Sequence, residues 1–243
     1  MPKIPGRDSF FLWTTVAIWA TVFTGFWFTY FGPMMAGSRT HDVAAVHLHG
    51  WTFFAWYVLL PVQAALAHRK RVAIHRMLGW LSVALAVLMV GTGLLVVGVR
   101  MADAAATGDP FWSASGPAVF ATLVLFAAFY SAGLFMRRRT DWHKRLMIVA
   151  GVGGMGAATF RLCMVLFGPN SAMWLGLMGS NVFIVAGIVR DRLRDKRVHP
   201  AWWIGLVACV ALEAGVLLLT PTPLGQAMSH ALAAVGRTFG FLY

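Results

Sequence analysis

The chain has 243 residues, of which 59% are hydrophobic and only 12% charged. Soluble globular domains carry about 25% charged residues, so this composition excludes an ordinary soluble protein and indicates a membrane protein. The net charge of +12 would favour nucleic-acid binding in a soluble chain, but the placement of the charges along this chain argues against nucleic acid as a partner.

Seven apolar runs are each long enough to cross a bilayer, which takes about 20 residues. They lie at about 10–31, 44–67, 77–99, 116–136, 146–167, 173–189 and 201–220. We therefore expect an all-α bundle of seven transmembrane helices, forming a single domain over residues 1–243. After the TPTP segment at 220–223, apolar residues recur at helical spacing, which predicts a short amphipathic helix at 224–238 on the external membrane surface.

The Lys and Arg residues are distributed unevenly between the connections. Sixteen of the 20 lie in the N-terminal segment and in the second, fourth and sixth connections. Basic residues accumulate on the cytoplasmic side of membrane proteins, so we expect a cytoplasmic N-terminus and an external C-terminus. The positive charge then reflects membrane topology rather than a polyanionic partner.

Two of the predicted helices contain helix-modifying residues. Pro61 should kink the second helix, and Gln63 is available to satisfy backbone groups freed by that proline. Gly151, Gly153, Gly154 and Gly156 resemble a nucleotide-binding fingerprint but lie mid-membrane without a preceding strand. We expect them to allow close helix packing.

Four ionisable residues lie away from the predicted helix ends and need an explanation, because charge is costly in a membrane interior. They are His47, His49, Arg161 and Glu213, all in the predicted external half. We expect Arg161 and Glu213 to form an internal ion pair, with Asn181 near the midplane completing a polar cluster. The alternative is a pocket around these residues for a quinone, a lipid headgroup or another small polar molecule.

The external histidines are also candidate metal ligands. His47 and His49 are two residues apart, which places them about 200° apart on a helix, so both cannot face one ion unless the helix begins at His49. A copper or zinc site would need His41 or His230 as a further ligand. Methionines of the same half are available for copper: Met34, Met35, Met164 and Met173.

The histidines on the cytoplasmic side lie among basic residues. We expect these histidines to contact acidic lipid headgroups or to cap helices. They are His68, His75, His143 and His199. The more specific hypothesis is that His75 and His143, which open the third and fifth helices at the same level, are axial ligands of one haem b.

Three motifs occur together in a characteristic order. They are HLHG at 47–50, HRMLG at 75–79, and HKRLM at 143–147 followed by AATFRL at 157–162. With these motifs, the stretch from Phe23 to Leu162 resembles a widespread family of uncharacterised bacterial inner-membrane proteins. The resemblance implies a bacterial inner membrane as location and brings no reaction. It implies these site residues: His47, His49, His75, Arg76, His143, Arg145 and Arg161.

A weaker likeness is to dihaem b-type membrane cytochromes, which also place histidines on successive helices. Those proteins often carry two ligands about four turns apart on one helix, where this chain has Pro61 and Gln63, and the fourth predicted helix has no histidine. A full dihaem core is therefore not expected, whereas a single haem with His/His or His/Met ligation stays open. The leading hypothesis is a membrane protein that holds a haem or metal ion for electron transfer or metal handling, with a redox partner and a membrane complex or homo-oligomer as possible associations. The competitor is a non-catalytic subunit or a quinone- or lipid-binding protein, and no catalytic residue is assigned.

Overall fold

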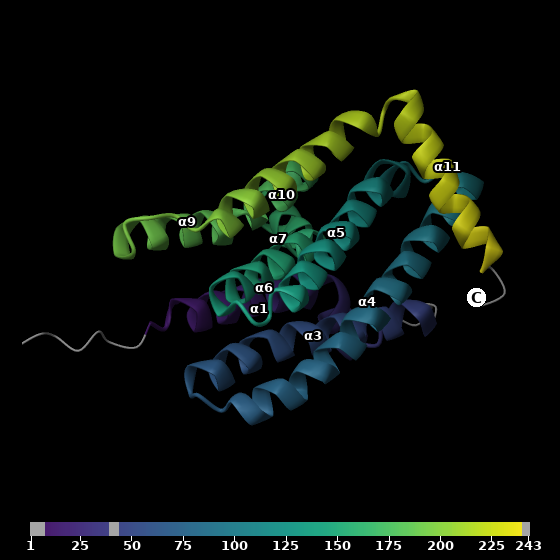
Figure 1. The fold of residues 1–243 in the computed structure, drawn as a ribbon. Coiled ribbons are helices and arrows are strands. Elements are labelled where there is room, and N and C mark those ends of the chain that lie inside the picture. Colours follow the sequence, from purple (N-terminus) through teal and green to yellow (C-terminus); the bar gives the residue numbers. More distant parts are fainter. Residues whose placement is uncertain (1–7, 39–43, 240–243) are drawn as a thin grey trace, which may run out of the picture.

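The computed structural model describes residues 8–38 and 44–239, apart from the side chains at 170 and 171. These residues form helices and turns, with no β-strand among them, so the all-α prediction is confirmed (Figure 1). The helices are α1 (Phe10–Phe26), the π-helix η1 (Trp27–Phe31), α2 (Gly32–Met35), α3 (Ala44–His68), α4 (Val72–Thr107), α5 (Pro110–Phe135), α6 (Thr140–Gly154), α7 (Gly156–Phe167), α8 (Pro169–Ser180), α9 (Val182–Arg194), α10 (Pro200–Leu219) and α11 (Pro223–Thr238).

Six of the described helices are long and apolar enough to cross a membrane, counting Phe10–Met35 and Ala172–Arg194 as single spans. The pair α6 and α7 makes a seventh span if its two parts are counted together. Large apolar side chains point outward from several spans, among them Trp13, Trp80, Val87, Phe135 and Val207. This exposure fits contact with a lipid bilayer, since a soluble protein rarely exposes large apolar patches.

The bundle has two distinct ends. The α3–α4, α5–α6 and α9–α10 connections lie at one end, together with the start of α1, and α11 lies at the other (Figure 1). We call the first of these the basic end, because these connections and the adjoining helix turns carry Arg69, Lys70, Arg71 and Arg76, then Arg137, Arg138, Arg139 and Lys144, then Arg192, Arg194, Lys196 and Arg197.

The third expected helix is longer at both ends than predicted. Hydropathy placed it at 77–99, whereas α4 has 36 residues and continues through Arg100 to Thr107. The sequence MADAAAT after Arg100 is rich in alanine, the strongest helix former, so the helix persists where hydropathy falls. It ends at Gly108, whose positive φ of 74° forms a left-handed C-cap.

The fifth and sixth expected helices are each divided in two. The fifth breaks at Met155, and α6 and α7 meet there at 53°. Its glycines pack as predicted: a Cβ on Gly153 would lie 2.8 Å from Leu125 Cβ, and one on Gly156 would lie 2.6 Å from Thr122 Cγ2. The sixth expected helix, placed at 173–189, breaks at Asn181 and extends to Arg194 as α9.

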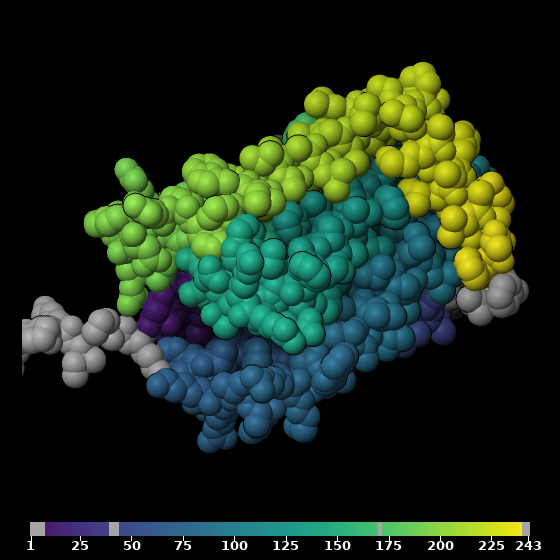
Figure 2. All heavy atoms as spheres, in the orientation of Figure 1, coloured from purple at the N-terminus to yellow at the C-terminus, as the bar shows by residue number. Residues whose placement is uncertain are grey.

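The C-terminal amphipathic helix forms as α11, at Pro223–Thr238 rather than 224–238. Its apolar face packs across α4, where Gly236 would bring a Cβ within 2.0 Å of the Gly98 carbonyl oxygen. Leu232 and Ala233 are buried in the same contact. Figure 2 shows α11, in yellow, covering the end of the bundle away from the basic end. Protein therefore covers at least part of the apolar face of this helix.

Candidate functional site

Two histidines from different helices meet at the basic end. His75 is in the first turn of α4 and His143 in the first turn of α6. Their ring centroids are 6.3 Å apart, with ring planes at 90°. The expectation that these two residues lie at the same level and face each other agrees with this geometry.

Hydrogen bonds to backbone carbonyls determine which ring nitrogens are protonated. His75 Nδ1 lies 3.2 Å from the Gln63 carbonyl oxygen, and His143 Nδ1 lies 2.8 Å from the Gly133 carbonyl oxygen. A carbonyl oxygen can only accept, so Nδ1 of each ring must donate its proton. In the neutral rings this leaves Nε2 with a free lone pair, the arrangement seen in metal-ligating histidines.

Gln63 joins α3 to α4 rather than serving its own helix. Its side-chain Nε2 donates to the His75 backbone carbonyl oxygen at 3.1 Å, and its backbone carbonyl oxygen accepts from Nδ1 of the His75 ring. Helix α3 runs through Pro61 without interruption. We expected the Gln63 side chain to hydrogen-bond the backbone groups that Pro61 leaves unpaired in α3. Instead, its amide binds the backbone of α4.

The histidines at the opposite end do not gather into one site. His47 Nδ1 is 2.8 Å from the Tyr30 hydroxyl, whereas His49 Nδ1 is 3.1 Å from Thr92 Oγ1 on α4. His230 lines a separate cavity of about 680 Å³ beneath α11, and His41 lies outside the described residues. Within 8–38 and 44–239, no three His, Cys, Asp or Glu side chains are grouped closely enough for a metal ion. The predicted copper or zinc site is thus not assembled from His47, His49 and His230.

A cavity of about 160 Å³ lies between α1, α3, α4, α5 and α7. Its polar lining includes Tyr30, His49, Arg100 and Arg161, and Phe26 and Trp112 contribute aromatic walls. Arg161 donates from Nη1 to the Ala157 carbonyl oxygen at 2.8 Å, and its guanidinium carbon is 4.6 Å from the Phe26 ring centroid. The pocket was expected around Arg161 together with Glu213 and Asn181; this cavity is lined by Arg161 and His49, with Arg100 as an unpredicted member, and neither Glu213 nor Asn181 lines it.

The predicted ion pair between Arg161 and Glu213 does not form. Glu213 on α10 accepts a hydrogen bond from Asn181 Nδ2 at 2.8 Å, and no ion pair joins it to Arg161. The expectation rested on similar depth in the membrane, but Arg161 points toward α1 and Glu213 toward the α8–α9 break. Asn181 does meet Glu213, so that part of the expected polar cluster is present.

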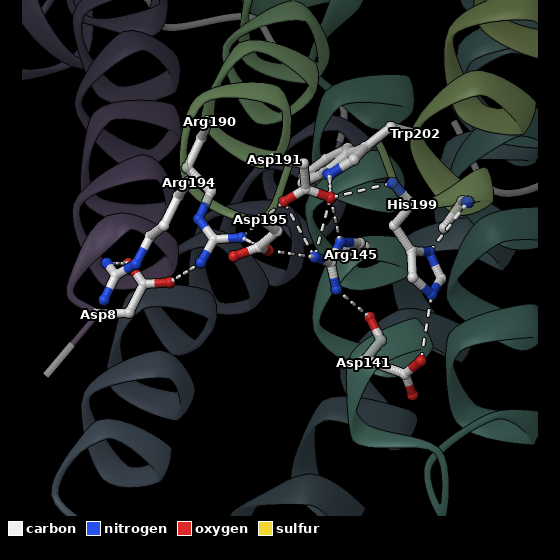
Figure 3. Close-up of polar contacts among 10 residues, drawn as sticks. Asp8, Asp141, Arg145, Arg190, Asp191, Arg194, Asp195, His199 and Trp202 are labelled. Carbon is white, nitrogen blue, oxygen red and sulfur yellow. Dashed lines mark hydrogen bonds and ion pairs between the residues drawn. The ribbon is translucent and has the colours of Figure 1, made fainter. Parts of the chain in front are cut away.

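Arg145, a residue of the third motif, belongs to an ion network rather than to the histidine pair (Figure 3). Its Nε and Nη2 donate to the two Asp191 carboxylate oxygens, each at 3.0 Å. Residues two apart on a helix point about 200° away from each other. His143 therefore faces α4 and α5, while Arg145 faces α9 and α10. Arg76, from the second motif, is exposed at the basic end.

Asp191 is the centre of this network and is fully buried. Besides Arg145, it accepts hydrogen bonds from Arg190 Nη1 at 2.7 Å, Trp202 Nε1 at 3.0 Å and the His199 backbone N–H at 3.2 Å. Arg190 also contacts Asp8 and Asp195. These contacts connect α6, α9, α10 and the start of α1 at the basic end.

Sequence reasoning missed Asp191 because the sixth helix was expected to end at 189, which placed this residue in a connection. The available signal was the segment RDRLRD at 190–195, where an Arg-Asp pair recurs after four residues, the spacing of one helical turn. Comparison with known proteins identifies no relative: no family model, curated protein or solved structure matches the chain. Membership in the inner-membrane family inferred from the three motifs therefore stays a prediction.

Proposed function

We propose that this chain is a multi-pass protein of a bacterial inner membrane that holds one haem b through His75 and His143 and serves in electron transfer. The observation that supports the proposal is the pair of carbonyl contacts at Nδ1, which leaves both Nε2 atoms available for coordination. A haem held by two histidines carries one electron at a time.

Two ligands fit a haem better than a bare ion. Zinc is usually held by four ligands, of which at least three come from protein. A haem iron already carries the porphyrin nitrogens, so His75 and His143 would be sufficient to hold it from the protein side. A copper or zinc ion at the same pair would lack a further protein ligand of these types, since the described residues place no third His, Cys, Asp or Glu beside these rings.

The chain's own groups would orient the ligands and bind the cofactor's edge. The Gln63 and Gly133 carbonyl groups hold the two imidazoles in one tautomer each. Arg76 is exposed next to His75 and provides a cation for the carboxylate groups of a haem. By the positive-inside rule we place the basic end in the cytoplasm, with the N-terminus cytoplasmic and the C-terminus external.

An absorption spectrum of the purified protein tests this proposal. We expect a Soret band that shifts on reduction, and its loss in His75→Ala and in His143→Ala. His68→Ala is the matched control, because His68 also lies at the basic end but outside the pair. A colourless preparation without stoichiometric metal, or a spectrum unchanged by both substitutions, would overturn the assignment.

A second candidate function, binding of a small aromatic molecule such as a quinone, is favoured by the cavity near Arg161. Its volume of about 160 Å³ is close to that of an apolar cavity of about 150 Å³ that accepts benzene. Two arginines and His49 supply donors for the oxygen atoms of a quinone ring. In this reading the protein is a binding subunit or a partner of a quinone-linked redox protein.

A pair of glycine variants tests the cavity. A Cβ on Gly93 would lie 2.9 Å from His49 Cε1, so Gly93→Ala should displace the imidazole and weaken binding of a short-chain quinone, measured by calorimetry. Gly91 lies on the same helix, and a Cβ added there would have nothing within 4 Å, so Gly91→Ala should bind as the parent does. Equal affinity of all three proteins would rule out this cavity as the quinone site.

A further inference from the structure

Glu213 carries a buried carboxyl group that is incompletely hydrogen-bonded. Its exposure is 1% and that of its partner Asn181 is 4%. Oε2 accepts from Asn181 Nδ2 at 2.8 Å. The other two oxygens of the pair, Glu213 Oε1 and Asn181 Oδ1, are buried and have no hydrogen-bond partner among the described residues. Two orphaned acceptors therefore lie in one buried contact, where native structures usually satisfy every polar atom.

Asn181 is turned toward this contact rather than used for capping. It stands at the N-cap of α9, a position where asparagine commonly accepts a hydrogen bond from the next helical turn. Here its side chain makes no such bond. The amide is directed at the Glu213 carboxyl across the gap between α9 and α10, at the break between α8 and α9.

No cation is placed to neutralise an ionised Glu213. Among the described residues, no Lys, Arg or His nitrogen lies within 4.0 Å of its oxygens. The nearest titratable group on its own helix is the Cys209 thiol, one turn earlier. The other described ionisable residues on or capping the helices packed against α10 make no hydrogen bond or ion pair to Glu213. They are Asp109 and Tyr130 of α5 and its N-cap, Asp141, His143, Lys144 and Arg145 on α6, Arg190, Asp191, Arg192 and Arg194 on α9, and His230 and Arg237 on α11.

We propose that Glu213 and Asn181 form a proton-binding site inside the membrane bundle. Binding is the simple addition of H⁺ to the carboxylate, on Oε1. The resulting O–H donates to Asn181 Oδ1 while Asn181 Nδ2 continues to donate to Oε2. One proton then satisfies both orphaned oxygens, and it removes a charge that is costly in a membrane interior.

The position of the site gives the proton a structural consequence. Release of H⁺ removes one of the two hydrogen bonds that join α10 to the α8–α9 break, and it leaves a negative charge beside that break. Ionisable residues inside membrane spans mark proton and ion pathways in many membrane proteins. The site does not involve the histidine pair, so it stands whether or not a haem is bound.

Glu213 is the only glutamate in the chain, which allows a test without mutation. Protein made by cell-free synthesis with glutamate that is ¹³C-labelled only at the side-chain carboxyl carbon, reconstituted in lipid nanodiscs, carries this label at one side chain. We expect the isotope-shifted infrared C=O band of a protonated carboxylic acid at neutral pH. The band should convert to carboxylate bands in strongly alkaline buffer. A carboxylate signal at neutral pH would overturn the proposal.

Two further measurements distinguish a proton from a metal cation and from an isolated acid. Adding Na⁺ in place of a large organic cation should leave the acid band unchanged; replacement of the band by a carboxylate signal would instead assign a sodium site and overturn the proton site. Asn181→Ala should move the acid band to higher frequency, because the hydrogen-bonded partner is lost. An unmoved band would mean that Asn181 is not the partner.

Discussion

Two buried carboxylates in this bundle have opposite environments. Asp191 on α9 accepts five hydrogen bonds, two from Arg145 and one each from Arg190, Trp202 and His199. Glu213 on α10 accepts one, from an uncharged amide. Both side chains are almost completely inaccessible, at 0% and 1% exposure. Burial alone therefore does not distinguish them.

The difference lies in how each charge is compensated. Donors surround Asp191 and include two guanidinium groups, so the ionised form is stable in place and the network holds four segments together. Glu213 has a single uncharged donor, so its protonated, neutral form is favoured, and this form can release a proton that the carboxylate can later take up again. A buried carboxylate with a full donor shell is a structural group, and one with a partial shell is a candidate functional group.

The largest effect is expected from replacing Asp191 with Asn. This change keeps the shape but leaves Arg145 and Arg190 without their buried counter-charge, which typically costs about 3–5 kcal/mol of unfolding free energy. An unfolding titration with denaturing detergent in mixed micelles measures the loss. Asp195→Asn is the matched control: its side chain is 44% exposed, so we expect a loss of about 0.2–1 kcal/mol. Equal losses in the two variants would contradict the structural role of Asp191.

An intermediate effect is expected from Asn181→Ala. The substitution leaves the Glu213 carboxyl buried without any side-chain partner, and an unsatisfied buried polar group costs about 1–3 kcal/mol. The same detergent titration applies. Combining this change with Glu213→Leu should restore much of the stability, because both polar partners are then removed. A double variant less stable than Asn181→Ala alone would show that the contact is not an isolated pair.

The smallest effect is expected from Glu213→Gln. The glutamine amide can form the same two-bond contact with Asn181 that the protonated acid forms, so unfolding free energy should change by less than about 1 kcal/mol. An ion pair with Arg161 would instead predict a loss of several kcal/mol for this substitution. Glu213→Gln and Asp191→Asn are equivalent carboxyl-to-amide changes. The difference between their losses of unfolding free energy therefore shows how much more the fold depends on the charge of Asp191 than on that of Glu213.

Hydropathy located the helices that are long and apolar enough to cross a membrane, because a crossing must be apolar over its whole length. It placed their ends less well. Arg100 looked like the end of a helix, yet α4 continues seven residues beyond it, since helix formation there depends on alanine propensity rather than on lipid. The break at Asn181 was also missed, because an apolar run has the same hydropathy whether its helix is continuous or divided.

The candidate residues illustrate a similar division. The pairing of His75 with His143 was expected, because both open helices at the same end of the bundle. The pairing of Arg161 with Glu213 was expected for a comparable reason, similar depth, and was wrong. Depth follows from position along a helix, whereas the direction in which a side chain points depends on how that helix is rotated against its neighbours. Asp191 was overlooked because its burial depends on that same packing.

Composition and the pattern of apolar runs were sufficient to predict that this chain is helical and suited to a membrane, since a segment that is apolar over its whole length is stable only in contact with lipid or with other apolar segments. Only the tertiary structure decided which polar groups meet: Arg145 with Asp191, Glu213 with Asn181, and His75 with His143. The physical reason is that the hydrophobic requirement acts on whole segments, whereas hydrogen bonds and ion pairs require particular atoms from distant segments to lie within about 3 Å.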